Sequence, residues 1–324
     1  MVVLNGVRWD YFLHLRGRLI RKIAEIDPVF VFCGGRPGVN AAVDSAFIDF
    51  RDNGCSSGRF TTRMVVCFSQ FFLSRVRGRS PRDVKAVLSF GFFPSLLFCP
   101  YLIFIQSRKK ICVLTGLGSF LNLPRVWQIF FSFLLKFFYT TIVVQNSVDK
   151  DYLVTNCFFS ADKITLIRGS GVDLMSVRKK YLPRRGCVRN DLGLGDRLVV
   201  TYLGRFVRSK GAETFIELFN EVRRRYRGEV NVTFLLCGRG YDRSDKLDLE
   251  DLEKYSHTGR VSFSVIETDL DGAALIAASD IFVCTSEREG LSMSTMEAMC
   301  LEKIALGFNV AGVGDLIVND HNGW

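Results

Sequence analysis

The sequence contains few residues of the kinds that form metal centres. It has only three histidines, His14, His257 and His321, and they lie far apart along the chain. Its ten cysteines form no C-x-x-C pair and no Cys/His spacing typical of a metal site. Several cysteines fall within apolar runs that resemble strands, which is typical of buried, reduced thiols. We therefore expect a cytoplasmic protein without a metal centre.

We expect no secretory signal peptide at the start of this sequence, because Arg8 and Asp10 interrupt the apolar run that such a signal needs. The longest uncharged stretch, residues 86–107, is long enough to span a bilayer. However, Ser89, Gly91 and two prolines break it, which favours a strand, a turn and a short helix over a spanning helix.

Acidic residues are scarce in the first part of the chain. Residues 1–196 hold 28 Lys+Arg and 13 Asp+Glu, and residues 197–324 hold 15 and 20, which together make the 43 and 33 of the whole chain. There is no nucleic-acid motif, and the many phenylalanines near basic residues favour an anionic membrane surface as partner. The basic turn at residues 75–82 is either a solvated loop or a contact with phosphate or lipid headgroups. The phenylalanine-rich helix predicted at residues 125–139 is apolar all round and belongs either to the core or to a membrane-contacting surface.

Strand-like and helix-like segments alternate along both halves, which predicts an α/β protein with parallel sheets. The 324 residues allow two domains, and a hydrophobic content of 48% is enough for two cores. Residues 175–196 are rich in charges and turn-forming residues, so we expect domains at 1–184 and 185–324. No internal repeat is visible.

Two carboxylates bracket a predicted strand–loop–helix junction in the second half. Glu289 and Glu297 have seven residues between them, after an apolar strand at 281–284 and around the start of a helix. Gly290 lets the backbone approach a ligand, and the first N–H groups of the helix would attract an anion. Alternatively, Ser294 and Glu297 fit a capping box, which would make Glu297 purely structural.

Two cations follow another predicted strand, in the segment Gly204-Arg205-x4-Lys210-Gly211. Cations held near a leaving diphosphate would favour the transition state over the ground state, although such charges also occur in ordinary loops. In the first half, the T-G-L-G loop at 115–118 and Asn146 each follow a strand. They are therefore expected at the carboxyl edge of the sheet, where open α/β folds bind ligands.

Together these motifs resemble the retaining GT-B glycosyltransferases of family 4. The resemblance rests on S-D-I-F-V-C-T-S-E-R-E-G-L-S-M-S-T-M-E-A-M, on G-R-x4-K-G, and on T-G-L-G, V-V-Q-N and I-R-G-S-G-V-D in that order. It is closest to the branch that acts on polyprenyl-diphosphate-linked surface glycans. It implies two Rossmann-like domains facing across a cleft, with the first binding acceptor and the second binding nucleotide-sugar donor. Family members continue beyond the position of Trp324, so we expect an incomplete second domain.

The resemblance also implies a role for each motif residue. Arg205 and Lys210 would stabilise the leaving diphosphate, Glu289 would orient the donor sugar, and Glu297 would hold the ribose hydroxyls. Backbone groups near the donor would come from Gly290, Leu291, Ser292, Gly204 and Gly238, and the acceptor or cleft residues would be Gly116, Gly118 and Asn146. No metal cofactor is implied, because cationic side chains would cover the diphosphate charge.

The expected activity is retaining transfer of an N-acetylhexosamine or related hexose from a UDP-sugar to a lipid-linked glycan. Such a reaction would serve bacterial surface polysaccharide synthesis, of O-antigen or capsule, at the inner face of the plasma membrane. Two alternatives stay open: a transferase of the same fold that uses GDP-mannose or UDP-glucose, and an inactive, membrane-docked protein that binds nucleotide sugars.

Overall fold

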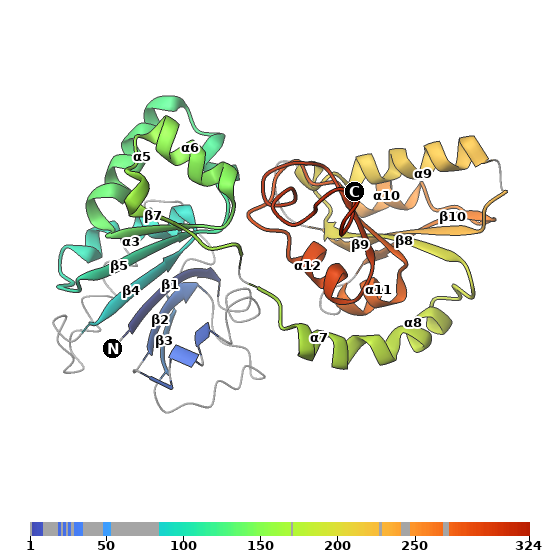
Figure 1. Cartoon of the computed structure of the whole chain (residues 1–324), viewed down its shortest axis with the longest axis horizontal. Coiled ribbons are helices and arrows are strands. Elements are labelled where there is room, and N and C mark those ends of the chain that lie inside the picture. Colours follow the sequence, from blue (N-terminus) through green and yellow to red (C-terminus); the bar gives the residue numbers. More distant parts are fainter. Residues whose placement is uncertain are drawn as a thin grey trace. The chain divides into compact units, whose positions relative to one another are not determined.

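The computed structural model describes residues 2–8, 19–20, 22–23, 25–26, 29–34, 48–52, 84–169, 171–226, 229–240, 247–267 and 272–324. The chain forms two compact units, Met1–Ser170 and Gly171–Trp324, each built on one parallel sheet (Figure 1). The basic turn predicted at 75–82 lies outside the described residues.

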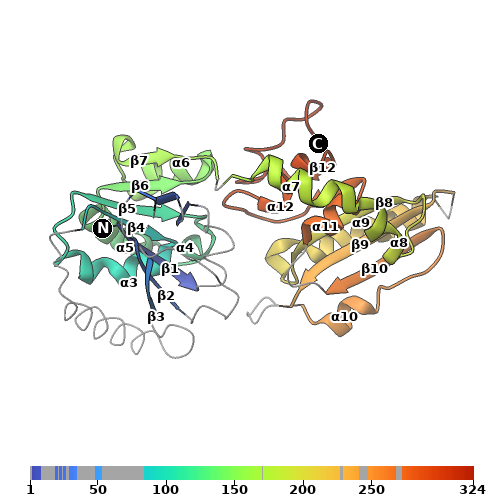
Figure 2. The ribbon, with the colours of Figure 1, turned by 90° about the horizontal axis from the view of Figure 1, so that it is seen from below.

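The first unit contains a seven-stranded parallel sheet in the order β3-β2-β1-β4-β5-β6-β7, which can be followed in Figure 2. Asn5 and Gly6 lie inside the first strand, whose register is irregular between Asn5 and Arg8. The strands are β1 (Val2–Arg8), β2 (Val29–Gly34), β3 (Ile48–Asp52), β4 (Ala86–Phe90), β5 (Lys109–Leu114), β6 (Thr141–Val144) and β7 (Ile164–Leu166).

Residues 86–107 fold as the sequence predicts, into a strand, a turn and a helix. Strand β4 ends at Phe90, Gly91 turns the chain with a φ of 90°, and α3 (Phe92–Leu102) follows with Pro100 inside it. Among the residues that the structure describes, no helix is both long and apolar enough to cross a bilayer. The other helical segments of this unit are α4 (Gly118–Leu121), α5 (Arg125–Phe138), α6 (Ser147–Cys157) and the short η3 (Ala161–Lys163).

The second unit has a five-stranded parallel sheet in the order β10-β9-β8-β11-β12. Its strands are β8 (Leu198–Arg205), β9 (Val232–Arg239), β10 (Val261–Glu267), β11 (Ile281–Cys284) and β12 (Ile304–Gly307). Its helical segments are α7 (Leu174–Tyr181), η4 (Leu182–Arg184), α8 (Arg185–Asp191), η5 (Arg208–Lys210), α9 (Ala212–Tyr226), α10 (Leu249–Glu253), α11 (Gly272–Ala278) and α12 (Met293–Cys300).

Helices cover both faces of this second sheet (Figure 1). Alternate residues of a strand point to opposite faces. Phe234 of β9 packs with Phe215 of α9, whereas its neighbour Leu235 packs with Leu275 of α11. Buried apolar side chains on both faces explain why the strands of this unit are almost continuously hydrophobic.

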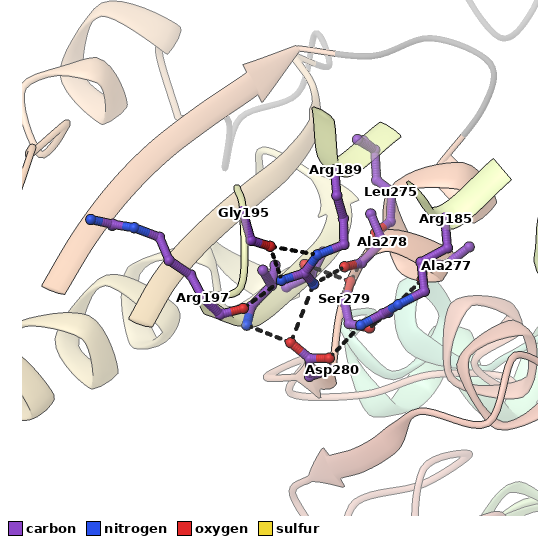
Figure 3. Close-up of polar contacts among 11 residues, drawn as sticks. Arg185, Arg189, Gly195, Arg197, Leu275, Ala277, Ala278, Ser279 and Asp280 are labelled. Carbon is purple, nitrogen blue, oxygen red and sulfur yellow. Dashed lines mark hydrogen bonds and ion pairs between the residues drawn. The ribbon is translucent and has the colours of Figure 1, made fainter. Parts of the chain in front are cut away.

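The units divide between residues 170 and 171, earlier than the boundary expected after residue 184. The charged segment 175–196 forms helices α7 and α8, and α8 is attached to the second unit around Asp280 (Figure 3). Arg185 donates to the carbonyl of Ala277 at 2.8 Å and to Asp280 Oδ1 at 2.6 Å. Arg189 donates to the carbonyl of Ala278 at 2.8 Å and lies 3.4 Å from Asp280 Oδ2.

Asp280 is held in its charged form by these contacts. Burial tends to raise its pKa, but the N–H of Val199, 2.8 Å from Oδ2, and the guanidinium groups of Arg185 and Arg189 outweigh burial and lower it. The positive charges of α8 therefore belong to a structural cluster of the second unit, and the segment is not a linker.

Candidate functional site

The candidate site lies where the strand order of the second sheet reverses. Strand β8 comes first in the sequence of this sheet, β9 and β10 follow on one side of it, and β11 and β12 lie on the other side. Ligands of open α/β sheets bind at the carboxyl ends of the strands beside such a switch point. The segment with Arg205 and Lys210 leaves the end of β8, and the segment with Glu289 leaves the end of β11, so the topology brings both motifs to this point.

Lys210 and Glu289 form an ion pair there, with 2.6 Å between Lys210 Nζ and Glu289 Oε1. Their side chains are 19% and 18% exposed, so both are largely buried yet open to solvent. Ser286 donates from its hydroxyl to Glu289 Oε1 at 2.8 Å. The two motif residues that the sequence places 79 positions apart are therefore direct neighbours, and a serine that the sequence analysis did not single out orients the carboxylate.

Two hydrogen bonds to backbone carbonyls join the loop that carries Lys210 to the loop that carries Glu289. Thr285 Oγ1 donates to the carbonyl of Gly211 at 2.7 Å, and the N–H of Glu287 donates to the carbonyl of Ser209 at 3.2 Å. Gly211 has a φ of 73°, and a Cβ at this position would lie 2.6 Å from the carbonyl carbon of Thr285. The glycine after Lys210 is therefore required both by its left-handed backbone and by close packing on the loop with Glu289.

The A-G-V-G segment that begins at Ala311 also binds the loop of Glu289 through backbone hydrogen bonds. The N–H of Glu289 donates to the carbonyl of Ala311 at 3.0 Å, and the N–H of Ser292 points to the carbonyl of Gly312 at 3.4 Å. Gly312 has a φ of 78°, and a Cβ there would meet the carbonyl oxygens of Glu289 at 2.6 Å and of Gly290 at 2.7 Å. The A-G-V-G segment thus helps to set the position of the candidate catalytic carboxylate.

Helix α12 begins two residues earlier than the capping-box alternative requires. Ser292 is its N-cap, and its hydroxyl accepts hydrogen bonds from the N–H of Thr295 at 3.3 Å and from Thr295 Oγ1 at 2.8 Å. Ser294 is therefore inside the helix, Thr295 occupies the third helical position, and the capping box of Ser294 and Glu297 is wrong. Ser292 itself has a structural role, and Leu291 is buried at 8% exposure.

Glu297 lies five positions after this N-cap and is half-buried. Burial raises the pKa of the Cys300 thiol, and the Glu297 carboxylate raises it further, while Arg178 of α7 lowers it. Glu297 and Cys300 are therefore neighbours on α12, a helix that contacts α7. Its predicted contact with the ribose stays a prediction.

Arg205 ends β8, with its backbone fixed at several points. Its carbonyl accepts from the N–H of Val207 at 2.8 Å and from the hydroxyl of Tyr202 at 3.2 Å. Gly204 pairs with Gly238 in the sheet, and a Cβ at Gly238 would lie 2.9 Å from the carbonyl carbon of Gly204. The two glycines therefore have a packing role in bringing the ends of β8 and β9 together, and their predicted proximity to the nucleotide stays a prediction.

Tyr202 is a residue of the site that the sequence analysis missed. It is only 2% exposed, and burial raises the pKa of its hydroxyl. Cys284 and Glu289 raise that pKa further, while Arg205 lowers it, so the phenol lies within electrostatic reach of both proposed catalytic charges. In the sequence this tyrosine looks like one more apolar position of a buried strand, and only the tertiary structure shows what its hydroxyl contacts.

The predicted acceptor or cleft residues belong to the first unit. Gly116 has a φ of 136°, which favours glycine, whereas a Cβ at Gly118 would find nothing within 4 Å. Asn146 is the N-cap of α6: its Oδ1 accepts from the N–H of Asp149 at 2.7 Å and its Nδ2 donates to Asp149 Oδ2 at 3.0 Å. The N–H of Leu117 also donates to Asp149 Oδ2, at 3.1 Å.

Asn146 and Asp149 are fully buried, so together they attach the T-G-L-G loop to the start of α6. The structure thus connects two of the predicted motifs, but through a carboxylate that the sequence analysis did not name. The signal was present, because an asparagine followed three residues later by an aspartate in a first helical turn is typical of a helix start.

The second-unit site combines a cation, a carboxylate and glycine-rich backbone at one sheet edge. A ligand with anionic oxygens and several hydroxyl groups would match this chemistry. Across the described ranges, no group of three or more His, Cys, Asp or Glu residues is placed to hold a metal ion.

Residues 188–324 match the model of the family described as glycosyl transferases group 1. The match runs from within α8 to the end of the chain, so the second unit carries the sequence signature of this family. It contains Arg205, Lys210, Glu289 and Glu297, the four charged residues predicted for donor binding and catalysis.

Curated relatives agree with this family. The alpha-D-kanosaminyltransferase of Streptomyces kanamyceticus is 31% identical over 147 residues, which are 43% of this chain and 35% of that protein. The capsular polysaccharide biosynthesis glycosyltransferase CapM of Staphylococcus aureus is 24% identical over 228 residues, which are 67% of this chain and 57% of that protein. The chain thus spans between about a third and just over half of the length of the curated relatives it matches.

Solved structures extend the likeness to the whole chain. HepE from Anabaena in complex with UDP-glucose has a TM-score of 0.74 at 14% identity, over 100% of this chain and 85% of that chain. Sucrose-phosphate synthase from Thermosynechococcus elongatus has a TM-score of 0.72 at 15% identity, over 99% and 84%. At these identities the likeness shows the fold alone, and it confirms the predicted class of two parallel-sheet α/β domains of the GT-B type.

Proposed function

We propose, starting from the group 1 glycosyl transferase signature of residues 188–324, that the chain transfers a sugar from a nucleotide diphosphate with retention of the anomeric configuration. The observation that carries the proposal is the Lys210–Glu289 ion pair at the switch point of the second sheet. A sugar diphosphate presents anionic oxygens to a cation and hydroxyl groups to a carboxylate, so one donor molecule satisfies both members of the pair.

In the proposed reaction, Lys210 and Arg205 contact the diphosphate. The negative charge of this leaving group becomes more exposed as the glycosidic bond breaks, so cations held beside it stabilise the transition state more than the bound donor. Arginine suits two-point contact with oxygens, and lysine acts as a mobile point charge. Because both side chains supply positive charge, we propose that turnover needs no metal ion, which activity in the presence of EDTA would test.

Glu289 orients the donor sugar by accepting hydrogen bonds from its hydroxyl groups, and Glu297 holds the ribose. Backbone N–H groups at Gly290, Leu291 and Ser292 contact phosphate or sugar oxygens of the donor, and the N–H of Ser292 also points to the carbonyl of Gly312. The short helix α12 adds a partial positive charge at this end.

The favoured donor is a UDP-sugar, and the favoured sugar is an N-acetylhexosamine or related hexose. Solved complexes of the structural neighbour HepE with UDP and with UDP-glucose support the nucleotide, although UDP-glucose and GDP-mannose stay alternative donors. The capsular polysaccharide role in the name of CapM supports an acceptor from bacterial surface glycans. We propose that this acceptor is lipid-linked and met at the cytoplasmic, anionic face of the plasma membrane, because the first unit is rich in basic residues.

A donor panel tests the proposal. The full chain is incubated with a series of UDP- and GDP-sugars and a bacterial membrane extract, and nucleotide release is measured. We expect release from a UDP-sugar that depends on the extract, with Glu253→Gln on exposed α10 as a control of unchanged activity. Binding of a nucleotide sugar without release from any donor would identify an inactive binding protein instead and overturn the proposed activity.

A further inference from the structure

Helix α5 of the first unit presents its most apolar stripe to solvent. Val126 is 75% exposed, Phe133 is 63% exposed and Phe137 is 73% exposed, and Ile129 and Phe130 between them are also exposed. These positions recur at three- and four-residue spacing, so they form one continuous stripe along the helix. Trp127 borders the stripe and is half exposed. The sequence leaves two locations open for this helix, the core or a membrane-contacting surface. A core location is wrong for the face that carries the stripe.

The opposite face of α5 is held against the unit by polar contacts. Gln128 and Ser132 are buried there, together with Leu135. Gln128 Nε2 donates to the carbonyls of Leu121 at 3.1 Å and Leu123 at 2.8 Å, and its Oε1 accepts from the hydroxyl of Tyr152 at 2.6 Å. Rolling the helix to bury the phenylalanines would break these bonds and expose the partners, so its orientation is fixed with the apolar stripe outward.

Both ends of the helix are attached to neighbouring structure by basic residues. Arg125 donates to the hydroxyl of Tyr152 at 3.2 Å, and Lys136 donates to the carbonyl of Phe158 at 2.6 Å. Phe158, at the end of α6, is itself 67% exposed. The stripe is therefore a rigid surface bordered by positive charge.

The charge around this stripe selects among partners. The charged residues of α5 itself are Arg125 and Lys136, and the helix contains no aspartate or glutamate. A second copy of this helix face would therefore bring like charges together. An anionic lipid surface instead offers negative headgroups to the basic residues and acyl chains to the phenylalanines.

We propose that the outward stripe of α5 inserts into an anionic lipid bilayer, with the helix lying in the plane of the membrane interface. The 14 residues of α5 make a helix of about 21 Å, too short to span the hydrocarbon core but suited to lying along its surface. The inference rests on the proposed function in that it names the surface by which the enzyme would reach a lipid-linked acceptor.

Vesicle flotation with the full chain and the double variant Phe130→Ser/Phe133→Ser tests this surface. We expect the wild type to bind vesicles of phosphatidylglycerol and phosphatidylcholine. The variant should bind at least about tenfold more weakly, because burying each phenylalanine side chain in the bilayer contributes to the free energy of binding. High salt should weaken the wild type only in part, because the apolar contribution is not screened. Phe308→Ser, at an exposed phenylalanine of the second unit, is the matched control and should bind as the wild type does.

Fluorescence locates the inserted element directly. In a chain with Trp9→Phe and Trp324→Phe, Trp127 is the only tryptophan, and its emission should shift to shorter wavelength when vesicles are added and be quenched by brominated acyl chains. Flotation unchanged by the double variant, or emission unchanged by vesicles, would overturn the proposal. Circular dichroism and thermal unfolding check that the variants fold.

Two further measurements separate the alternatives. Light scattering after size-exclusion chromatography reports the oligomeric state: a wild-type dimer that the double variant converts to monomer, with no change in flotation, would identify a second copy as the occupant and overturn the lipid proposal. Nucleotide release is measured in parallel. If the double variant no longer floats with vesicles but still releases nucleotide in detergent-dispersed extract, the membrane role of the stripe is supported. If the wild type floats normally but releases no nucleotide, the proposed function is contradicted while the proposed membrane surface is retained.

Discussion

Gly211→Ala should destabilise the second unit strongly, because the glycine lies between the two loops that carry the proposed catalytic charges. Its φ of 73° costs an alanine about 1 kcal/mol of backbone strain. The new Cβ would lie 2.6 Å from the carbonyl carbon of Thr285, where ordinary contact begins at 3.4 Å. Relieving that overlap costs about 1–3 kcal/mol and stretches the Thr285–Gly211 hydrogen bond, worth about 1 kcal/mol.

The expected loss is therefore about 3 kcal/mol or more in the free energy of unfolding, and two glycines of the same unit serve as controls. Gly193 also has a left-handed φ, of 61°, but a Cβ there meets nothing within 4 Å, so Gly193→Ala should lose only about 1 kcal/mol. Gly186 is exposed inside α8 with open space around it, so Gly186→Ala should gain about 0.5–1 kcal/mol.

Urea unfolding followed by circular dichroism measures the three differences, and nucleotide release reports the site. Displacement of the Lys210 loop by a few tenths of an ångström or more should also lower kcat for Gly211→Ala, while both controls keep it. A Gly211→Ala variant as stable as Gly193→Ala would refute the reasoning, since it would mean that the loop is not packed against Thr285.

Three other predictions concern charges. Glu289→Gln keeps the shape of the side chain and removes its charge, so kcat should fall on the order of a hundredfold, and near-normal turnover would remove Glu289 from the mechanism. Arg205→Ala and Lys210→Ala should each lower kcat/KM, and the double variant should lose less than the sum of the two losses in activation free energy; strictly additive, small effects would indicate ordinary surface charges. Burial lowers the pKa of Lys303 to about 8, and Arg185 lowers it too, although Asp280 opposes them. The native state therefore releases this proton at lower pH than the unfolded chain, so the stability of the wild type relative to Lys303→Met should rise between pH 8 and 10, and a flat or falling difference in urea midpoints would contradict this assignment.

The sequence predicts the second unit well because its chemistry is local. The strand, loop and helix around Glu289 are specified within about twenty residues, and the segment from Gly204 to Gly211 is equally compact. Parallel topology then brings the two segments together, because both follow strands whose carboxyl ends lie at one edge. That Lys210 and Glu289 would pair directly could not be read from their spacing.

The features that the sequence did not predict depend on contacts between distant residues. Asp280 binds Arg185 and Arg189 about ninety residues earlier, which attaches α8 to the second unit. Gly312 is needed for its approach to Glu289 and Gly290, which no local pattern indicates. The sequence analysis left the orientation of α5 open because it treated the helix as apolar all round, but the structure buries the polar side chains of Gln128 and Ser132 and turns the phenylalanine stripe outward.

When no ligand is bound, Lys210 and Glu289 compensate each other's charge. A bare phosphate that drew Lys210 away would break its ion pair with Glu289, a carboxylate that is only 18% exposed. A free sugar whose hydroxyl groups bound Glu289 would likewise draw it away from Lys210. Removing one partner of a largely buried ion pair raises the free energy of the complex, because the remaining charge is less well compensated. Only a ligand that brings phosphate and sugar hydroxyls together replaces both halves of the pair at once. If the chain uses a nucleotide-sugar donor as proposed, the spent nucleotide, which offers phosphate but no sugar hydroxyls, should bind more weakly than the intact donor.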